Sequence, residues 1–392
     1  MKKENLLVVT HNWIRHLEDY AGQFLYTIYH EMEDKYNIFV VCPHAEGLKL
    51  KEKFGNITVY RYKYWSTSGE DIAYIGNLDQ AVRKSPGTFI KSISMILAAA
   101  WCSIKVIRKH DIDFLHSHWW IPGGISGYIA SVLTGKRLIL TSHGADILLL
   151  KEFKFLRFFA RIIHNRAKYI STVSTFLRRS LIDAIGIDER KVLIFPMPFD
   201  VEKFIPKGDV QREPGSVLII ARMIPRKGHQ YLILACKELI EQGYDIKLNI
   251  IGYGPEKENI QNMINELKLN EYIKILDPVD HKENVKYYHK ASMFVLPSIT
   301  EGFGVVYAES LACGIPTIAT NDGGAVDIVQ DGITGLTVPS RDHLKLAEAM
   351  KFMLDNPEIA MQYAAAGQEF VKNTFTPQHI AKKMLDLYEG NY

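Results

Sequence analysis

Residues 298–309 read SITEGFGVVYAE and follow an apolar run that has the length and composition of a buried strand. Gly302 and Gly304 stand where the chain turns from this strand into a helical pattern. A helix N-terminus offers unpaired backbone N–H groups and a partial positive charge, which suits a phosphate. Glu301 and Glu309 can each accept two hydrogen bonds from the paired hydroxyls of a sugar. The stretch suits a phosphate and the paired hydroxyls of a sugar, but in isolation a glycine-rich turn with an acidic N-terminus is the more economical explanation.

Two shorter motifs precede this stretch, and each follows an apolar strand pattern. Residues 221–228 read ARMIPRKG and bring Arg222 and Lys227 to the carboxyl end of a strand, where paired cations favour a diphosphate. Residues 251–255 read IGYGP, which is again strand, glycine and helix. Taken alone, the basic loop is equally well explained by a solvated surface loop.

Short apolar runs alternate with longer helical patterns along the chain, which is typical of a parallel sheet covered on both faces. Strands are expected at 6–10, 38–42, 57–60, 114–116, 138–142 and 169–173, and again at 216–221, 246–251, 273–276, 293–296, 317–319 and 335–338. Helices are expected at 24–35, 88–109, 230–242, 256–268, 285–290, 305–313, 344–356 and 377–388. The pattern predicts an α/β fold of two doubly wound domains facing a cleft, with ligands at the carboxyl ends of the strands.

A proline-rich run separates the two series. Pro196 and Pro198 disfavour both a helix and a central strand, so the domain boundary is placed there. The first domain is expected over 1–197 and the second over 201–375, with a further helix within 376–392.

Composition and charge limit the class of protein. The chain has 47 Lys and Arg against 44 Asp and Glu; residues 1–200 carry a net charge of +8 and residues 201–392 one of −5. The basic half suits phosphates or an anionic membrane surface, or simply reflects uneven solvated faces. The four cysteines form no metal or disulfide pattern. The longest apolar stretch, 93–107, is interrupted by polar residues, and no signal peptide is recognised, so a cytoplasmic protein is expected.

In order and spacing, the motifs at 221–228, 251–255 and 298–309 resemble the donor domain of glycosyltransferase family 4. So do ACGIP at 312–316 and the glycine-containing segments at 323–329 and 331–335. Members of that family are retaining enzymes with the GT-B fold. The resemblance covers nearly the whole chain, is most specific over 217–339, and implies that the last helix crosses back onto the first domain.

The resemblance also implies roles for the matching residues in the donor site. Glu301 is expected on the hydroxyls of the donor sugar and Glu309 on the ribose, while Arg222 and Lys227 neutralise the diphosphate. Further donor-binding positions are Gly22, Gly252, Gly302, Phe303, Gly304 and Val305. Where the family often has two glycines after its first strand, this chain has Ala21 and Gly22.

Three histidines end predicted strands of the first half. The family typically has a histidine like His143 near the anomeric carbon of the donor, where a neutral or protonated imidazole can contact the sugar or share developing charge. For His116 and His118 a packed, structural role is the more economical reading. His118, Trp119 and Asp146 are nevertheless candidates for contact with the acceptor.

The predicted reaction is retaining transfer of a hexosyl unit from a nucleoside-diphosphate sugar to a hydroxyl of a glycan or glycolipid. Neither a cofactor nor a metal is required, because Arg222 and Lys227 carry the diphosphate charge. The D-x-D sequence at 111–113 precedes its strand and is read as a helix end. Alternatives are a nucleotide-sugar epimerase or hydrolase of the same fold, and a non-catalytic subunit that binds a sugar nucleotide. No nucleic-acid partner is expected.

The segment 151–168 is basic and aromatic. As one helix it would place Lys154, Arg157, Arg161 and Lys168 near one face, with Leu156, Phe159, Ala160 and Ile163 on another. Such a face suits an anionic membrane, and a peripheral position on the inner face of the membrane is expected. The alternative is a helix that packs on its own sheet with a solvated basic side.

Overall fold

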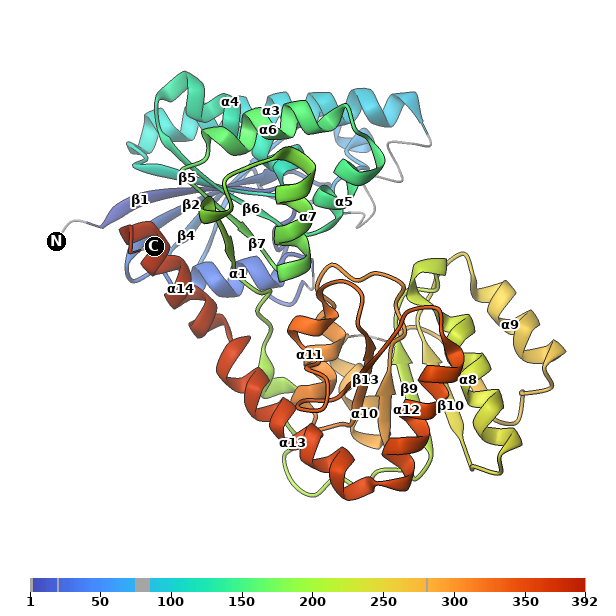
Figure 1. The fold of residues 1–392 in the computed structure, drawn as a ribbon. Coiled ribbons are helices and arrows are strands. Elements are labelled where there is room, and N and C mark those ends of the chain that lie inside the picture. Colours follow the sequence, from blue (N-terminus) through green and yellow to red (C-terminus); the bar gives the residue numbers. More distant parts are fainter. Residues whose placement is uncertain (1–2, 20, 75–84, 280, 392) are drawn as a thin grey trace. The chain divides into compact units, whose positions relative to one another are not determined.

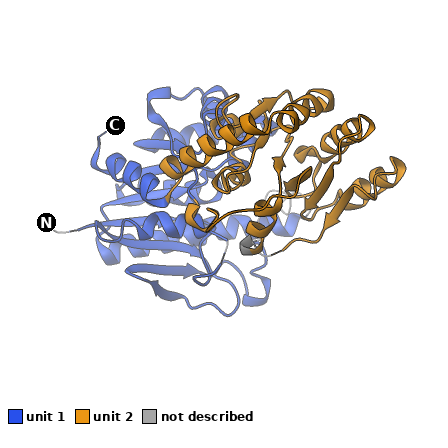
Figure 2. Ribbon diagram, turned by 90° about the horizontal axis from the view of Figure 1, so that it is seen from below, with its two compact units in different colours: residues 1–198, 377–392 blue, residues 199–376 orange. Residues whose placement is uncertain are grey.

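The computed structural model describes residues 3–19, 21–74, 85–279 and 281–391 (Figure 1). The chain forms two compact units, residues 1–198 with 377–392 and residues 199–376 (Figure 2). It leaves the first unit within the proline-rich run and returns to it just before the last helix. Each unit is built around one sheet, as the alternation of apolar runs and helical patterns predicts.

The first unit contains an eight-stranded sheet of order β3-β4-β2-β1-β5-β6-β7-β8, parallel except between β3 and β4. Its strands are β1 Glu4–Val9, β2 Tyr36–Pro43, β3 Lys51–Phe54, β4 Ile57–Tyr62, β5 Phe114–His118, β6 Arg137–Ser142, β7 Tyr169–Thr172 and β8 Val192–Ile194. Its helices are α1 Gln23–His30, α3 Pro86–His110, α4 Ile125–Thr134, α5 Ala145–Glu152, α6 Leu156–Arg166, α7 Thr175–Ile185 and α14 Pro377–Glu389. The strand order reverses at β1, which lies between β2 and β5.

The second unit contains a six-stranded parallel sheet of order β11-β10-β9-β12-β13-β14. Its strands are β9 Ser216–Ile220, β10 Lys247–Ile251, β11 Ile273–Leu276, β12 Met293–Val295, β13 Thr317–Thr320 and β14 Leu336–Val338. Its helices are α8 His229–Glu241, α9 Lys257–Glu266, α10 His281–Lys290, α11 Val305–Ala312, α12 His343–Asp355 and α13 Pro357–Thr374. Here the order reverses at β9, which pairs with both β10 and β12, so the loops after β9 and β12 meet at the reversal.

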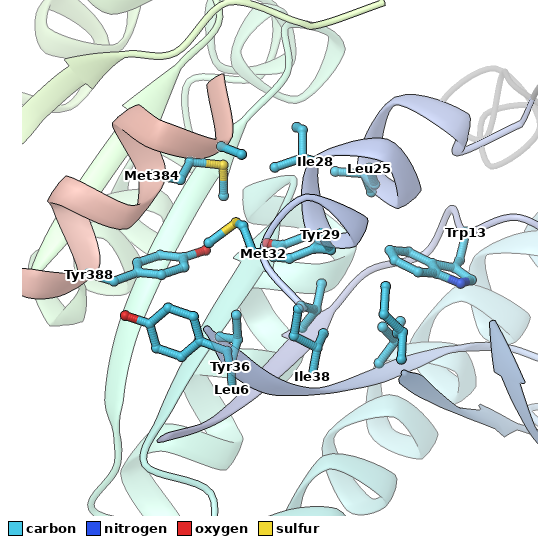
Figure 3. Close-up of a cluster of buried hydrophobic side chains, with 14 of the residues drawn as sticks. Leu6, Trp13, Leu25, Ile28, Tyr29, Met32, Tyr36, Ile38, Met384 and Tyr388 are labelled. Atoms are coloured by element: carbon cyan, nitrogen blue, oxygen red, sulfur yellow. The ribbon is translucent and has the colours of Figure 1, made fainter. Parts of the chain in front are cut away.

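The last helix packs on the first unit. Met384 and Tyr388 of α14 point toward Met32 and Tyr29 in a shared apolar core (Figure 3). The ring of Tyr388 also lies 5.0 Å from that of Phe114, centre to centre. Each buried apolar side chain of this kind contributes about 1.5–3 kcal/mol. The core of the first unit is therefore completed by residues more than 300 positions from its first strand.

Helices α3, α4 and α6 lie together on one face of the first sheet (Figure 1), and α3 packs along α4. Among the described residues, α3 is the one helix long and apolar enough to cross a membrane by length and composition, with a mean hydropathy of 1.6 over its best window. The interrupted run at 93–107 did not predict this. One side of α3, which includes Met95, Ala99 and Ile104, is nonetheless buried in the unit.

The structure adds elements that the sequence patterns did not single out, and it corrects one segment. The added elements are strands β3 and β8 and helices α4, α5, α7 and α13. The segment 151–168 is not one helix, because α5 ends at Glu152 and α6 begins at Leu156. Lys154 and Lys168 therefore lie outside α6, and Phe159, expected on a packed face, is exposed.

Candidate active site

The donor motifs of the sequence meet at the carboxyl edge of the second sheet, where the strand order reverses. The loop after β9 and the loop after β12 are joined by a backbone hydrogen bond, in which the N–H of Ile299 donates to the carbonyl of Arg226 over 2.8 Å. Gly228 has a φ of +71°, and a Cβ there would lie 2.0 Å from the carbonyl oxygen of Pro297. The close approach of these loops brings Lys227 and Glu301 together.

Lys227 and Glu301 form an ion pair, in which the ammonium group donates to Oε2 of the carboxylate. Glu301 is 9% exposed. Burial alone would raise the pKa of its carboxyl, but Lys227, Arg226 and the Gly302 amide together bring that pKa below its usual value. The Glu301 side chain is therefore an anion at neutral pH and a strong hydrogen-bond acceptor.

Arg222 stands two residues beyond the end of β9 and is half-buried. Among the described residues, no side-chain hydrogen bond or ion pair engages its guanidinium group. Such a group at a strand end retains its full capacity for a bidentate contact with a phosphate. Arg222 and Lys227 thus provide two cations on one loop, one of which is already paired.

The glycine-rich stretch forms the entry to α11. Gly304 precedes the helix with a φ of +86°, and a Cβ there would lie 2.6 Å from the Tyr307 ring. Phe303 is buried, and its ring lies 5.6 Å from that of Phe375, centre to centre. Gly302 and Val305 are half-buried. This anchoring orients the first amides of α11, which supports the predicted contact with a phosphate or sugar.

Glu309 is 1% exposed and lies on α11. The hydroxyl of Tyr288 donates to its Oε2 over 3.0 Å. Tyr288 could not be selected from the sequence, because a tyrosine in a helical pattern is typical of the core. The contact makes Tyr288 a group that orients the carboxylate predicted to bind ribose.

Gly252 has a structural reason to be glycine. Its φ is +156°, and a Cβ would lie 2.0 Å from the carbonyl oxygen of Ala221. Gly22 is similar, because a Cβ there would lie 2.7 Å from the backbone of Trp13. Both glycines allow loops to pack at the strand ends, and their expected contact with the donor remains a prediction.

In the first unit, His116, His118 and His143 form a hydrogen-bonded chain with two tyrosines. The hydroxyl of Tyr388 lies 2.5 Å from Nδ1 of His116, and that of Tyr29 lies 3.0 Å from the same atom and 2.6 Å from Nε2 of His118. Nδ1 of His118 lies 3.0 Å from Nε2 of His143. Because a neutral imidazole donates on one nitrogen and accepts on the other, the proton arrangement at Tyr29 determines the tautomer of His143.

His143 is neutral in this setting. Burial, together with repulsion from His116 and His11, lowers the pKa of its imidazole to about 3. Its ring lies 4.2 Å from the Trp119 ring, centre to centre. Among the described residues its Nδ1 has no hydrogen-bond partner. Of the two forms considered from the sequence, the neutral imidazole is the one that the structure supports.

The three acceptor candidates differ in their surroundings. Asp146 is buried, and its carboxylate accepts backbone N–H groups of His143, Gly144 and Trp120 over 2.9–3.1 Å. Its oxygens hold the loop after β6 and are not presented to a ligand. His118 is buried as well.

Trp119 is half-buried and has a φ of +58°. A strained backbone of this kind is commonly found at ligand sites. Of the three candidates, Trp119 is the one whose surroundings suit contact with an acceptor.

The chain of histidines gives a prediction for the last helix. Tyr388→Phe removes the hydroxyl that faces His116 in a buried site, and is expected to lower the free energy of unfolding by about 1 kcal/mol. Tyr36→Phe is the matched control, since its ring packs 5.6 Å from that of Tyr388 and the described residues record no hydrogen bond for its hydroxyl. Urea denaturation followed by circular dichroism compares the two. Equal losses in both variants would contradict the hydrogen-bonding role.

Two family models match the chain. The model described as "Glycosyltransferase Family 4" matches residues 21–203, and "Glycosyl transferases group 1" matches residues 200–370. An uncharacterized glycosyltransferase of Methanocaldococcus jannaschii is 30% identical over 282 residues, which are 72% of this chain and 77% of that protein. A GDP-mannose-dependent alpha-(1-6)-phosphatidylinositol monomannoside mannosyltransferase of Mycolicibacterium smegmatis is 27% identical, over 73% of this chain and 78% of that protein.

Solved structures share the fold. Sucrose-phosphate synthase from Thermosynechococcus elongatus has a TM-score of 0.78 at 19% identity. The match covers 99% of this chain and 98% of the synthase chain. HepE of Anabaena, solved with UDP and glucose, has a TM-score of 0.72 at 18% identity. The match covers 99% of this chain and 100% of the HepE chain. These neighbours are glycosyltransferases of the GT-B type.

Proposed function

The chain belongs to glycosyltransferase family 4, and we propose that it transfers a hexosyl unit from a nucleoside-diphosphate sugar to a hydroxyl of a glycolipid or glycan, with retention of configuration and without a metal. One observation carries the proposal: a paired lysine and an anionic glutamate meet where the second sheet reverses its strand order, and the loop of the lysine also holds an arginine without a side-chain partner among the described residues. That edge is where open α/β sheets bind ligands.

In the proposed reaction Arg222 and Lys227 bind the donor diphosphate and stabilise its charge as the bond to the sugar breaks. Glu301 accepts hydrogen bonds from the hexose and Glu309 from the ribose. His143, as a neutral imidazole, supplies a hydrogen bond to the sugar. The leaving phosphate takes the proton of the acceptor hydroxyl on the same face, which retains the configuration. The two cations replace the metal that would otherwise offset the diphosphate charge.

The second unit is proposed to bind the donor and the first unit the acceptor. The mycobacterial relative is named for transfer from GDP-mannose to a phosphatidylinositol mannoside, and HepE was solved with UDP, which supports a nucleotide-sugar donor and a lipid-linked acceptor here.

A panel of nucleotides and nucleoside-diphosphate sugars tests the proposal by thermal shift. A donor at 100 times its Kd adds about 2.7 kcal/mol of stability. Transfer is then followed with that donor in the presence of EDTA, and the anomeric configuration of the product is read by NMR. Complete consumption of donor without acceptor would point to a hydrolase or epimerase instead. Loss of transfer in EDTA would contradict metal independence.

The basic segment is proposed to hold the protein at the inner face of an anionic membrane. Lys154, Arg161 and Lys168 are exposed, but Arg157 is half-buried and donates to the carbonyl of Leu150 over 2.8 Å. The same segment exposes four large apolar side chains, Phe155, Phe158, Phe159 and Ile162. Exposed aromatic groups beside cations suit the headgroup region of a bilayer.

The prediction uses the three exposed members of the predicted basic face and leaves out the fourth, Arg157, because it has a structural contact. Replacing Lys154, Arg161 and Lys168 together with Gln is expected to weaken binding to anionic vesicles by about 1 kcal/mol per charge at low salt. Vesicle binding of the wild-type protein should weaken by the same amount when salt rises from ~0.1 M to ~1 M, because the Debye length falls from ~10 Å to ~3 Å. Vesicle co-sedimentation measures both effects.

The matched control replaces Lys247, Lys286 and Lys345 of the second unit, which are also exposed, with Gln. It should bind vesicles like the wild type. If the two triple variants bind equally well, the basic segment is a solvated surface and has no lipid role.

A further inference from the structure

The solvent-facing side of α3 is apolar over most of its length. Phe89, Ile90, Ile93, Leu97 and Trp101 are 44–58% exposed. Their spacing places them in one stripe along the helix, roughly 18 Å long at 1.5 Å per residue. A surface helix of a globular protein normally presents polar side chains on this side. The stripe is therefore a feature that the packing of the first unit does not explain.

The same stripe becomes basic toward the end of the helix. Lys105, Arg108 and Lys109 are exposed, and the Lys105 ammonium group lies 5.1 Å from the centre of the Trp101 ring. Lys91, the remaining cation of α3, is half-buried and paired with Asp71 over 2.7 Å. An apolar stripe that ends in cations matches the change from acyl chains to anionic headgroups across a bilayer surface.

Neighbouring helices extend this surface. At the end of α4, which packs along α3, Val132 and Leu133 are 52% and 63% exposed. Helices α3, α4 and α6 together contain seven Lys and Arg and no Asp or Glu. Along the chain from the end of α3 to the start of α6, the acidic residues are Asp111, Asp113, Asp146 and Glu152. Asp146 is buried, and Asp113 accepts the backbone N–H of Asn5 over 2.7 Å.

We propose that the exposed stripe of α3 is an apolar anchor that enters the headgroup and acyl boundary of an anionic bilayer. Lys105, Arg108 and Lys109 then contact lipid phosphates. The inference deepens the lipid contact proposed for the basic segment and rests on it for the nature of the partner. It adds a second attachment whose main contribution is of a different physical kind, because the apolar stripe binds by burying apolar surface and salt does not screen that contribution.

The charges favour a bilayer over a second copy of the chain. In a symmetric dimer each patch would face its own copy. The cations of α3 would then be desolvated against a patch whose helices α3, α4 and α6 offer no acidic residue, and buried charge without a partner is destabilising. A bilayer that contains anionic lipid complements the apolar stripe and the cations at once.

The test combines binding with a depth measurement. Vesicles contain equal parts of phosphatidylglycerol and phosphatidylcholine, with or without brominated acyl chains that quench tryptophan fluorescence. The protein carries Trp65→Phe, because Trp65 is the other strongly exposed tryptophan among the described residues. Brominated chains are expected to quench part of the emission, and Trp101→Phe should remove that quenching while binding persists.

The anchor itself is tested by Ile93→Gln, Leu97→Gln and Trp101→Gln together. We expect at least a tenfold loss of vesicle partition at both ~0.1 M and ~1 M salt. The control, Leu344→Gln with Phe352→Gln and Met361→Gln, removes comparable exposed apolar groups from the second unit and should bind like the wild type. The basic-segment triple variant, by contrast, should lose partition at low salt only.

Three results would overturn the inference. They are wild-type binding without quenching by brominated chains, equal partition of the anchor and control variants, and a wild-type dimer that the anchor variant converts to monomer without any vesicle binding. Transfer to a water-soluble acceptor is measured in parallel. Quenching without transfer would contradict the proposed function and still support the apolar anchor. Transfer without quenching would support the proposed function and contradict the anchor.

Discussion

Replacing Lys227 with alanine is expected to lower kcat/KM about 10²-fold or more and to leave the fold intact. Removing one charge-stabilising donor from a water-excluded site typically costs about 3–4 kcal/mol of transition-state stabilisation. The fold should persist because Glu301 keeps the Ser298 hydroxyl, 3.4 Å from its Oε2, as a hydrogen-bond donor. Steady-state kinetics with a saturating acceptor measure the effect, and circular dichroism confirms folding.

Arg222→Ala should give a loss of similar size. Lys237→Ala is the control for both variants, because Lys237 is a half-buried cation on α8 whose only described ion pair is with Glu241. Near-normal kcat/KM in the Arg222 and Lys227 variants would remove the basic loop from the active site. A melting temperature far below that of the control would instead assign the lost activity to unfolding.

Glu301→Gln is expected to reduce transfer about 10²-fold and to preserve binding of the free nucleoside diphosphate. The amide has the shape of the carboxylate but lacks the charge that strengthens its hydrogen bonds to the hexose. Because Glu301 pairs with Lys227 in the ligand-free protein, its neutralisation also leaves that ammonium group available for the diphosphate. Calorimetric titration with the nucleoside diphosphate and with the intact donor separates the two effects.

Glu309→Gln, unlike Glu301→Gln, should weaken binding of the free nucleotide. The ribose contact is made whether or not a hexose is attached, so the free nucleotide and the intact donor should lose affinity by the same factor. Tyr288→Phe should give a smaller loss of nucleotide affinity than Glu309→Gln, because it removes a hydrogen bond to Glu309 and keeps the carboxylate. Equal losses of nucleotide affinity in the Glu301 and Glu309 variants would refute the separate roles.

Much of this architecture could be predicted because buried parallel strands are continuous apolar runs. The order of the donor motifs along the chain then placed Arg222, Lys227 and Glu301 in loops that follow strands which prove to be adjacent, β9 and β12. Strand β3 was missed because its sequence, KEKF, is charged, as an antiparallel strand at the sheet edge can be. Strand β8 was also missed, although its three residues are apolar and the expected strands β12 and β14 are equally short.

The errors in the segment 151–168 have a different cause. Cations and aromatic groups recur there at intervals close to the helical period, so the pattern favours one helix. The break at residues 153–155 follows from tertiary packing, which no local pattern records. Tyr29, Tyr288 and Tyr388 could not be selected either, since a buried tyrosine shows its polar partner only once the fold brings distant residues together.

The division of the first unit between two stretches of the chain affects its synthesis on the ribosome. Domains generally fold as units, the N-terminal one first. Here the second unit is contiguous, whereas the first lacks Met384 and Tyr388 until α14 has been translated. At ~5–20 residues per second, the residues between the two stretches take about 10–40 s to make. During that interval the apolar groups around Met32 and Tyr36 have no cover from α14, which makes them a binding site for chaperones on the nascent chain. A stop codon at position 377 would release a protein with an intact second unit and a permanently open first one.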